Sequence, residues 1–336
     1  MNILLTGGSG FIGSHAAEAM LERGWEVWCA VRRNSSRRFL GDSRLHIVEI
    51  DFGDEVAMEA ALRGVRFDAV VHAAGATKCV RKSDFHRCNT ELTARLVNVI
   101  QRICSPCGST DAGRPLPRFI FLSSLSAVNS VEGEALGKPT AYGASKREAE
   151  KIVEQSRLPW VILRPTGVYG PRERDYFMMV QTLCRHIDFA AGFSPQRITF
   201  VYVADVVQAI MLAVEGEAEK VAGHIFTLSD GETYTSRDFS RLITDELSAL
   251  KGKKHRVWRV TAPLFVLRAI CWGGDILMRV TGKAVTLNND KYNILSQSDW
   301  RCDISASRRL LGFKPEVKLA EGVRRTVLWY KQNGWI

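Results

Sequence analysis

LLTGGSGFIG, residues 4–13 of the 336-residue chain, lies between two patterns of different period. Before it, Asn2 to Thr6 form a short apolar run, which is typical of a strand buried on both faces. After it, apolar residues recur with helical spacing from Phe11 to Arg23, and Gly24 is a natural C-terminal cap. The glycines therefore lie in a loop between a strand and a helix.

Three glycines of this loop recur every third residue, and each has a physical use. Gly7 permits a tight turn, Gly10 lets the backbone approach a pyrophosphate, and Gly13 lets the helix pack closely against the strand. The N-terminus of the helix offers free N–H groups and a positive dipole to phosphates. Because of the strand and helix around it, we interpret the segment as a dinucleotide-binding loop rather than a merely flexible one.

Further apolar runs alternate with helical stretches along the first half of the chain. The predicted strands are residues 26–31, 45–50, 68–74, 118–124 and 160–165. This alternation predicts an α/β fold of the Rossmann type, a doubly wound parallel sheet with right-handed crossovers. Ligands bind such sheets at the carboxyl ends of the strands.

The strand rhythm fades after Pro165, where helical segments joined by glycine-containing links take over. The predicted helices are Asp175–His186, Ala204–Glu215 and Ser236–Leu250. We therefore expect a cofactor domain at 1–165, with part of 198–228 returning to it, and a smaller, mostly helical substrate domain at 166–336.

The end of the second strand indicates which nicotinamide cofactor is used. NAD sites usually carry an acidic residue there, which binds the ribose 2′-OH. This strand instead ends in AVRRNSS, so Arg32 and Arg33 occupy that place, and two guanidinium groups suit a 2′-phosphate. We predict NADP(H), with NAD(H) as the alternative if both arginines are only surface residues. Asp51 and Phe52, after the third strand, are expected beside the adenine.

The segment AYGASK supplies candidate catalytic residues. Tyr142 and Lys146 are four residues apart, on one face of a helix. An unperturbed phenol, with a pKa near 10, is a poor base at neutral pH, but a nearby ammonium lowers that pKa. Tyr142 is then able to exchange a proton with a substrate oxygen that Ser124, at the end of the fifth strand, holds by a hydrogen bond. The intact trio argues against a non-catalytic dinucleotide sensor on the same fold.

Taken together, these motifs resemble the extended short-chain dehydrogenases/reductases, the NAD(P)-dependent epimerase/dehydratase family. The matching segments are TGGSGFIG, DFGD, HAAG, FLSS, YGASK and LRPTGVYGP, with weaker matches as far as EGVRRTVLWY, so the resemblance covers nearly the whole chain.

The resemblance implies a set of cofactor contacts besides Arg32, Arg33, Asp51, Phe52, Tyr142 and Lys146. They are Gly7, Gly10, Phe11, Ile12 and Gly13 at the pyrophosphate, Ala73, Ala74 and Gly75 beside the adenine ribose, Asn89 as a support of the active site, and Pro165 and Val168 at the nicotinamide end.

The sequence indicates less about the substrate than about the fold or the cofactor. The stretch from Ala262 to Val280 predicts an amphipathic helix with one apolar stripe, which resembles the branch containing 3β-hydroxysteroid dehydrogenases and dihydroflavonol reductases. We expect a ketone or secondary alcohol of a mostly apolar small molecule. The alternative is a nucleotide-sugar epimerase or dehydratase with bound NAD, whose diphosphate would need a cation such as Arg197. Thr77 and Thr166 are further candidate substrate residues.

Composition bears on possible partners of the protein, on its compartment and on metal binding. Lys and Arg outnumber Asp and Glu by 46 to 36, but the basic residues are scattered, so we expect no nucleic-acid partner. Eight cysteines without a secretion signal predict a reduced, cytoplasmic protein. Cys104 and Cys107 form a lone C-x-x-C, which without further ligands does not predict a metal site. No apolar run is long enough to span a bilayer. A homodimer is left open.

Overall fold

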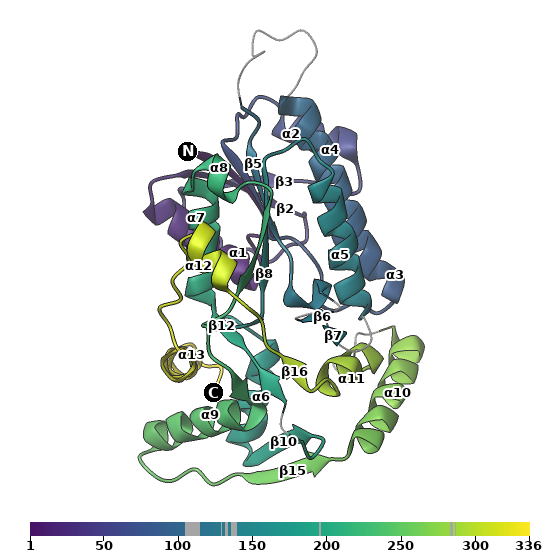
Figure 1. Ribbon diagram of the computed structural model, residues 1–336, viewed down its shortest axis with the longest axis vertical. Coiled ribbons are helices and arrows are strands. Elements are labelled where there is room, and N and C mark those ends of the chain that lie inside the picture. The colour runs from purple at the N-terminus through teal and green to yellow at the C-terminus, as the bar shows by residue number, and fades with distance from the viewer. Residues whose placement is uncertain are drawn as a thin grey trace.

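A computed structural model describes residues 1–104, 115–128, 130–131, 134–135, 140–194, 196–282, 285 and 287–336. Its main feature is a seven-stranded sheet with the order β13-β8-β5-β4-β1-β2-β3, in which every neighbouring pair is parallel (Figure 1). The strands are β1 (Asn2–Thr6), β2 (Glu26–Val31), β3 (His46–Glu49), β4 (Ala69–His72), β5 (Arg118–Leu122), β8 (Trp160–Pro165) and β13 (His224–Leu228).

Helices cover both faces of this sheet because its strands are apolar on both sides. One face packs on α1 (Phe11–Glu22) and α7 (Val203–Glu215), where Ile3 and Leu5 join the core. The other face packs on α2 (Glu55–Leu62), α4 (Leu92–Cys104) and α5 (Ala141–Glu154), where Leu4 joins the core. The doubly wound parallel sheet predicted from the sequence is therefore confirmed.

The segment between β4 and α4 is irregular. It contains a short helix, α3 (Lys82–Phe85), followed by a π-helical stretch over His86–Glu91, which includes Asn89. Asn89 thus lies one turn before the regular helix α4, and π-helical turns are frequent at functional sites. After β5, Leu125–Ala127 form a 3₁₀ turn, and the strands β6 (Ser130–Val131) and β7 (Glu134–Ala135) follow.

The smaller C-terminal part is mostly helical, and most of it lies below the sheet in Figure 1, whereas residues 203–228 and 305–310 lie within or beside the sheet. A third core joins its parts, and Tyr169, Phe200, Phe239 and Tyr330 belong to it. Its elements and the remaining ones are β9 (Gly167–Tyr169), α6 (Asp175–Cys184), β10 (Ile187–Ala191), β11 (Arg197–Ile198), β12 (Phe200–Tyr202), α8 (Ala218–Val221), β14 (Tyr234–Thr235), α9 (Ser236–Lys251), β15 (Trp258–Ala262), α10 (Leu264–Thr281), α11 (Asn289–Leu295), β16 (Asp299–Trp300), α12 (Ser305–Leu310) and α13 (Leu319–Gln332).

The segment before α10 and the loop after α4 bear on two sequence expectations. The stretch from Ala262 to Val280 is not one helix, because Ala262 ends β15 and α10 begins at Leu264 after Pro263. Most of the loop that contains Cys107 falls outside the described residues. Within the part of the chain that the structure describes, no helix is long and apolar enough to cross a membrane.

Candidate active site

The glycine loop between β1 and α1 is as tight as its sequence indicates. Gly7 has a φ of +76°, and a Cβ there would lie 2.6 Å from the backbone of Ala73 and Ala74, on the loop after β4. A Cβ on Gly13 would lie 2.2 Å from the carbonyl oxygen of Gly7. Gly10, at the N-cap of α1, has no side chain to cover the helix N-terminus. The loop therefore leaves backbone N–H groups and a positive dipole available to an anion.

Two neighbouring cavities open at this end of the sheet. The first, of about 220 Å³, is lined by the glycine loop, the end of β2 and the loop after β4, including Gly7, Gly10, Arg32 and Gly75. The second, of about 690 Å³, is lined by the ends of β2 and β3 and by the start of α4. Both include Arg32 and Phe52, so together they form one continuous groove.

Four arginines line the second cavity. They are Arg32, Arg33, Arg87 and Arg95. Arg87 and Arg95 are paired with Asp84 and Glu91, at 3.1 Å each. Arg32 and Arg33 are exposed, and neither is ion-paired with another described residue. Glu49, which is paired with Arg37, and Asp51 also line this cavity. The outer end of the groove therefore offers two guanidinium groups, of Arg32 and Arg33, that have no ion-pair partner among the described residues, as a ligand with an additional phosphate requires.

Tyr142 and Ser124 meet where α5 approaches the 3₁₀ turn after β5. The approach depends on Gly143, because a Cβ there would lie 2.1 Å from the carbonyl oxygen of Ser126. Thr140 caps α5 and accepts a hydrogen bond from the Gly143 N–H at 2.9 Å. Burial raises the pKa of the Tyr142 phenol, and its hydrogen bond with Ser124 opposes that rise.

Lys146 is buried one turn along α5 from Tyr142. Its ammonium donates to the carbonyl oxygen of Leu122 at 2.8 Å and lies 4.7 Å from the centre of the Phe121 ring. Burial lowers the pKa of Lys146 to about 8, although the nearby Glu150 carboxylate acts in the opposite direction. A Cβ on Gly75 would lie 3.2 Å from Nζ, so Gly75 leaves the ammonium open towards the groove.

Asn89 connects the loop after β4 to α5. Its side-chain oxygen accepts from the Ala76 N–H at 2.7 Å, and its amide donates to Ser145 Oγ at 2.9 Å. The side chain is 1 % exposed, so its hydrogen bonds are shielded from water. Asn89 therefore fixes the position of Gly75 and Ala76 relative to the helix that carries Tyr142 and Lys146.

A buried ion pair supports the same helix from behind. Glu150 is fully buried and binds Arg164 of β8 through two hydrogen bonds of 2.7 and 2.6 Å. The Ser123 hydroxyl donates to Glu150 at 2.6 Å. Of the neighbouring serines, Ser123 is thus engaged in the interior, whereas Ser124 is the one beside Tyr142.

A third cavity, of about 320 Å³, lies beyond Ser124, between the sheet and the C-terminal part. Its wall is largely apolar, with Pro165, Phe189, Ile198, Phe200 and Trp300 among its residues. The Thr166 hydroxyl is buried in this wall and has no hydrogen-bond partner among the described residues. The cavity therefore suits an apolar molecule that carries few polar groups.

Some of the candidate substrate and nicotinamide residues line the third cavity, and others lie outside it. Pro165 and Thr166 line the third cavity, and Val168 packs between two cores in β9. Thr77 is exposed in the loop after β4. Arg197 is exposed and does not line the cavity, whose wall instead contains its neighbours Gln196 and Ile198.

Several lining residues escaped the sequence analysis. Leu92 and Arg95 of α4 line the groove. They follow Asn89 by three and six residues, and this near-helical spacing could have placed them on the same side of the helix as Asn89. In the third cavity, Tyr176, Gln196 and Lys291 add polar groups to the wall. Lys291 comes from a segment more than a hundred residues after the sheet helix α5, and burial lowers its pKa.

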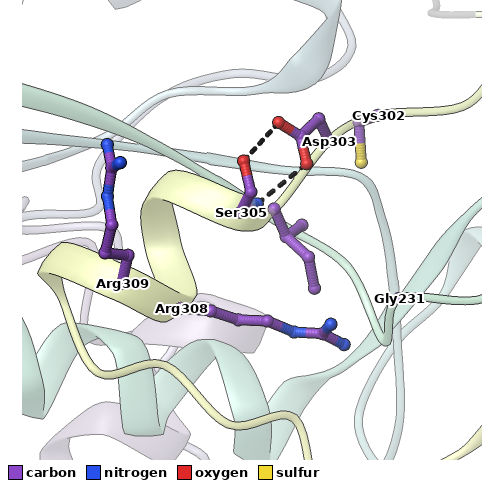
Figure 2. A pocket seen from close by; sticks show the side chains of 7 residues that line it. Gly231, Cys302, Asp303, Ser305, Arg308 and Arg309 are labelled. Atoms are coloured by element: carbon purple, nitrogen blue, oxygen red, sulfur yellow. Dashed lines mark hydrogen bonds between the residues drawn. The ribbon is translucent and has the colours of Figure 1, made fainter.

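Another hollow, of about 510 Å³, lies near α12 and is shown in Figure 2. Arg308 and Arg309 line it, and the Arg308 side chain points towards Gly231 (Figure 2). Asp303 also lines the hollow, and its carboxylate accepts hydrogen bonds from the backbone N–H and the hydroxyl of Ser305 at the start of α12. The hollow contains none of the predicted site residues. Among the described residues, no cluster of His, Cys, Asp or Glu could hold a metal ion.

Comparison with known proteins agrees with this geometry. A model of the NAD dependent epimerase/dehydratase family matches residues 3–229. The chain belongs to this family. Members of the epimerase/dehydratase family are NAD(P)-dependent oxidoreductases and epimerases of the extended short-chain type, so the predicted family, the nicotinamide dinucleotide and the oxidoreductase kind of chemistry are confirmed at that level.

Proteins that are similar to this chain differ from one another in activity. The chain is 24% identical to a ceramide reductase of Caulobacter vibrioides, over 99% of the chain and 96% of that protein. It is 27% identical to a UDP-glucose 4-epimerase of Vibrio cholerae, over 98% and 96%. The structure of a UDP-glucose 4-epimerase from Thermotoga maritima matches with a TM-score of 0.74 at 22% identity, covering 99% of both chains. The last likeness shows the epimerase/dehydratase fold alone.

Proposed function

We propose that the protein is an NADP(H)-dependent oxidoreductase that transfers hydride between nicotinamide and a ketone or secondary alcohol of a mostly apolar small molecule. The observation that carries the proposal is that Tyr142 meets Ser124 one helical turn from the buried Lys146, next to a largely apolar cavity. Residues 1–165 would hold the cofactor, and residues 166–336 would supply most of the substrate pocket.

The groove fits a dinucleotide because its closest approaches are made by glycines. Gly7, Gly10 and Gly13 would hold the pyrophosphate at the N-terminus of α1, and Gly75 would admit the ribose beside Lys146. Arg32 and Arg33 would bind a 2′-phosphate at the outer end of the groove. When bound, the cofactor supplies or accepts the hydride.

The chain itself supplies the proton. The Tyr142 hydroxyl donates a proton to the substrate oxygen in reduction and removes it in oxidation, while Ser124 holds that oxygen by a hydrogen bond. The hydrogen bond with Ser124 opposes the effect of burial on the pKa of Tyr142, and the Lys146 ammonium, one turn along α5, would favour the phenolate by its opposite charge. The low dielectric around Lys146 strengthens this interaction.

Arg32→Ala/Arg33→Ala is expected to weaken NADPH binding at least tenfold more than NADH binding. Each arginine would lose a charge-assisted contact with the 2′-phosphate, worth about 1.5–3 kcal/mol. The measurement is a titration of each cofactor against the wild type and the variant. Lys151→Ala, which removes an exposed cation on α5, is the matched control and should change neither affinity. Equal losses for both cofactors would contradict the assignment.

The apolar wall favours a reductase over a nucleotide-sugar enzyme, because a diphosphate needs several cations, whereas Arg197 lies outside the cavity wall and Lys291 is the single cation among its described lining residues. The wild type should therefore show no saturable binding of UDP in calorimetry, and it should consume NADPH with apolar ketones. Tight UDP binding that Arg197→Ala or Lys291→Ala abolishes would instead support the epimerase or dehydratase alternative. Among similar proteins, the ceramide reductase and a sterol-4-alpha-carboxylate 3-dehydrogenase of Dictyostelium discoideum carry names that fit the first outcome.

A further inference from the structure

Large apolar side chains are exposed together on β10, β15 and α10, at the lower end of the molecule in Figure 1. Trp258 is 78% exposed, Phe265 76%, Trp272 63% and Val280 79%. We call the surface formed by Phe189, Trp258, Val260, Phe265, Trp272, Ile276 and Val280 the apolar face. Exposed patches of this kind mark interaction sites, because isolated exposed residues would be scattered over the whole surface.

The helix α10 is apolar on two sides. Leu267, Cys271 and Met278 are buried and form the stripe that the sequence predicted. The opposite side carries Phe265, Ala269, Trp272, Ile276 and Val280, which recur at helical spacing and face away from the protein. Packing against the described residues accounts for the first stripe alone, so the second stripe is available to an external apolar phase.

The strands β10 and β15 extend this surface. They pair in parallel with Phe189 opposite Val260, so these two side chains lie on the same side of the ribbon, and Trp258 joins them because successive side chains alternate. Asp188 and Arg259 lie on the other side, where they form an ion pair of 2.9 Å. The ribbon is therefore apolar outside and polar inside, the reverse of an ordinary edge of a water-soluble protein.

Charge around the apolar face is mainly positive. Residues 251–282 contain seven Lys and Arg but one acidic residue, Asp275, which is turned towards Asn289. Arg268 and Arg279 flank the outer stripe of α10, and Lys253, Lys254 and Arg256 are exposed just before β15. None of these five side chains is ion-paired with a described carboxylate. Exposed aromatic side chains flanked by unpaired cations are the pattern of surfaces that lie on anionic lipid.

We propose that the apolar face docks on the surface of an anionic phospholipid bilayer. The aromatic side chains enter the interfacial region, and the flanking cations contact lipid phosphates. A second copy of the chain fits less well, because two-fold pairing of this face would bring two surfaces with the same excess of positive charge together.

Docking would place the substrate cavity at the membrane. Phe189 belongs both to the apolar face and to the wall of the third cavity, and Ala190 and Ala191 continue that wall. An apolar substrate is thereby able to pass from the bilayer to the cavity without crossing water. The passage of substrate from the bilayer rests on the proposed function, whereas docking itself requires neither cofactor nor turnover.

The test is flotation of the purified protein with vesicles, without cofactor or substrate. We expect binding to phosphatidylcholine vesicles that contain about 30 mol% phosphatidylglycerol, weaker binding to pure phosphatidylcholine, and a further loss near ~0.5 M salt. Phe265→Ser/Trp272→Ser should lower the affinity about tenfold or more, because two aromatic side chains no longer enter the interface. Arg268→Glu/Arg279→Glu should lower it by about fivefold or more for each charge removed.

Matched control variants change similar exposed side chains away from the apolar face. Val56→Ser changes an apolar residue that is 78% exposed on α2, and Lys151→Glu/Arg157→Glu reverses two exposed charges on α5 and the turn after it. Neither control should alter vesicle binding, and because all changed side chains are exposed, all variants should fold. Absence of wild-type binding to anionic vesicles would overturn the proposal. So would a dimer in sedimentation that Phe265→Ser/Trp272→Ser dissociates while vesicle binding is unchanged.

Discussion

Tyr142→Phe is expected to lower turnover by about 10²-fold or more while leaving cofactor affinity close to that of the wild type. The change removes one hydroxyl and keeps the ring that contacts Phe85, at a centroid distance of 6.1 Å. Lys146 keeps its hydrogen bond to Leu122, so the cofactor groove should not change. The loss should therefore fall on kcat, because only the proton transfer is removed.

The measurement is a comparison of kcat and cofactor Kd for both proteins on a ketone that the wild type reduces. Tyr176→Phe is the matched control, since Tyr176 lines the third cavity together with Ser124 but belongs to α6 and has no proposed part in the proton transfer. It should leave kcat within a few-fold of the wild type. Normal turnover by Tyr142→Phe, or an equal loss in Tyr176→Phe, would show that the acid–base assignment is wrong.

The fold was predictable because its signals are local. The strand residues 2–6 and the helix from Phe11 match β1 and α1, and Gly7 has the positive φ that a tight turn needs. The same holds for Tyr142 and Lys146, whose spacing of four places them on one side of α5 whatever the rest of the chain does. Residues that share one element carry their relative positions in the sequence.

Positions that depend on packing between distant segments could not be predicted in this way. Lys291 reaches the third cavity because α11 folds back beside α5, where Asp290 accepts a hydrogen bond from the Ala141 N–H at 3.0 Å. Alternation of side chains over Gln196 and the two residues of β11 places Gln196 and Ile198 in the wall instead of Arg197. The apolar pattern of α10 predicted a helix, but pattern alone does not tell which of two apolar stripes is buried.

The ion pair behind the active site leads to the second large expected effect, which is on stability. Glu150 is 0% exposed and binds Arg164, Arg147 and Ser123. Burial alone would raise the pKa of Glu150, but the hydrogen bonds and charge of Arg164 outweigh it and hold that pKa below its usual value. Glu150 is therefore a carboxylate whose main partner, Arg164, is itself largely buried.

Glu150→Gln is expected to lower the free energy of unfolding by about 3–5 kcal/mol, because it leaves the Arg164 guanidinium without a countercharge in the interior. Glu154→Gln, one turn further along α5, is the matched control. Among the described residues Glu154 pairs with Arg147 alone, near the surface, so its loss should cost under ~1 kcal/mol. Chemical denaturation of the three proteins measures both values.

The same pair predicts how the effect of Glu150→Gln depends on pH. A carboxyl whose folded pKa lies below its unfolded value, about 4.3 for Glu, stabilises the fold fully above that value and loses the contribution as pH falls through the folded pKa. The stability difference between wild type and Glu150→Gln should thus be constant near neutrality and shrink in acid. A difference that persists unchanged at low pH would mean that packing, not charge, makes Glu150 important. Since Ser123 is bound to Glu150 and adjoins Ser124, the variant should also lower kcat, whereas Glu154→Gln should not.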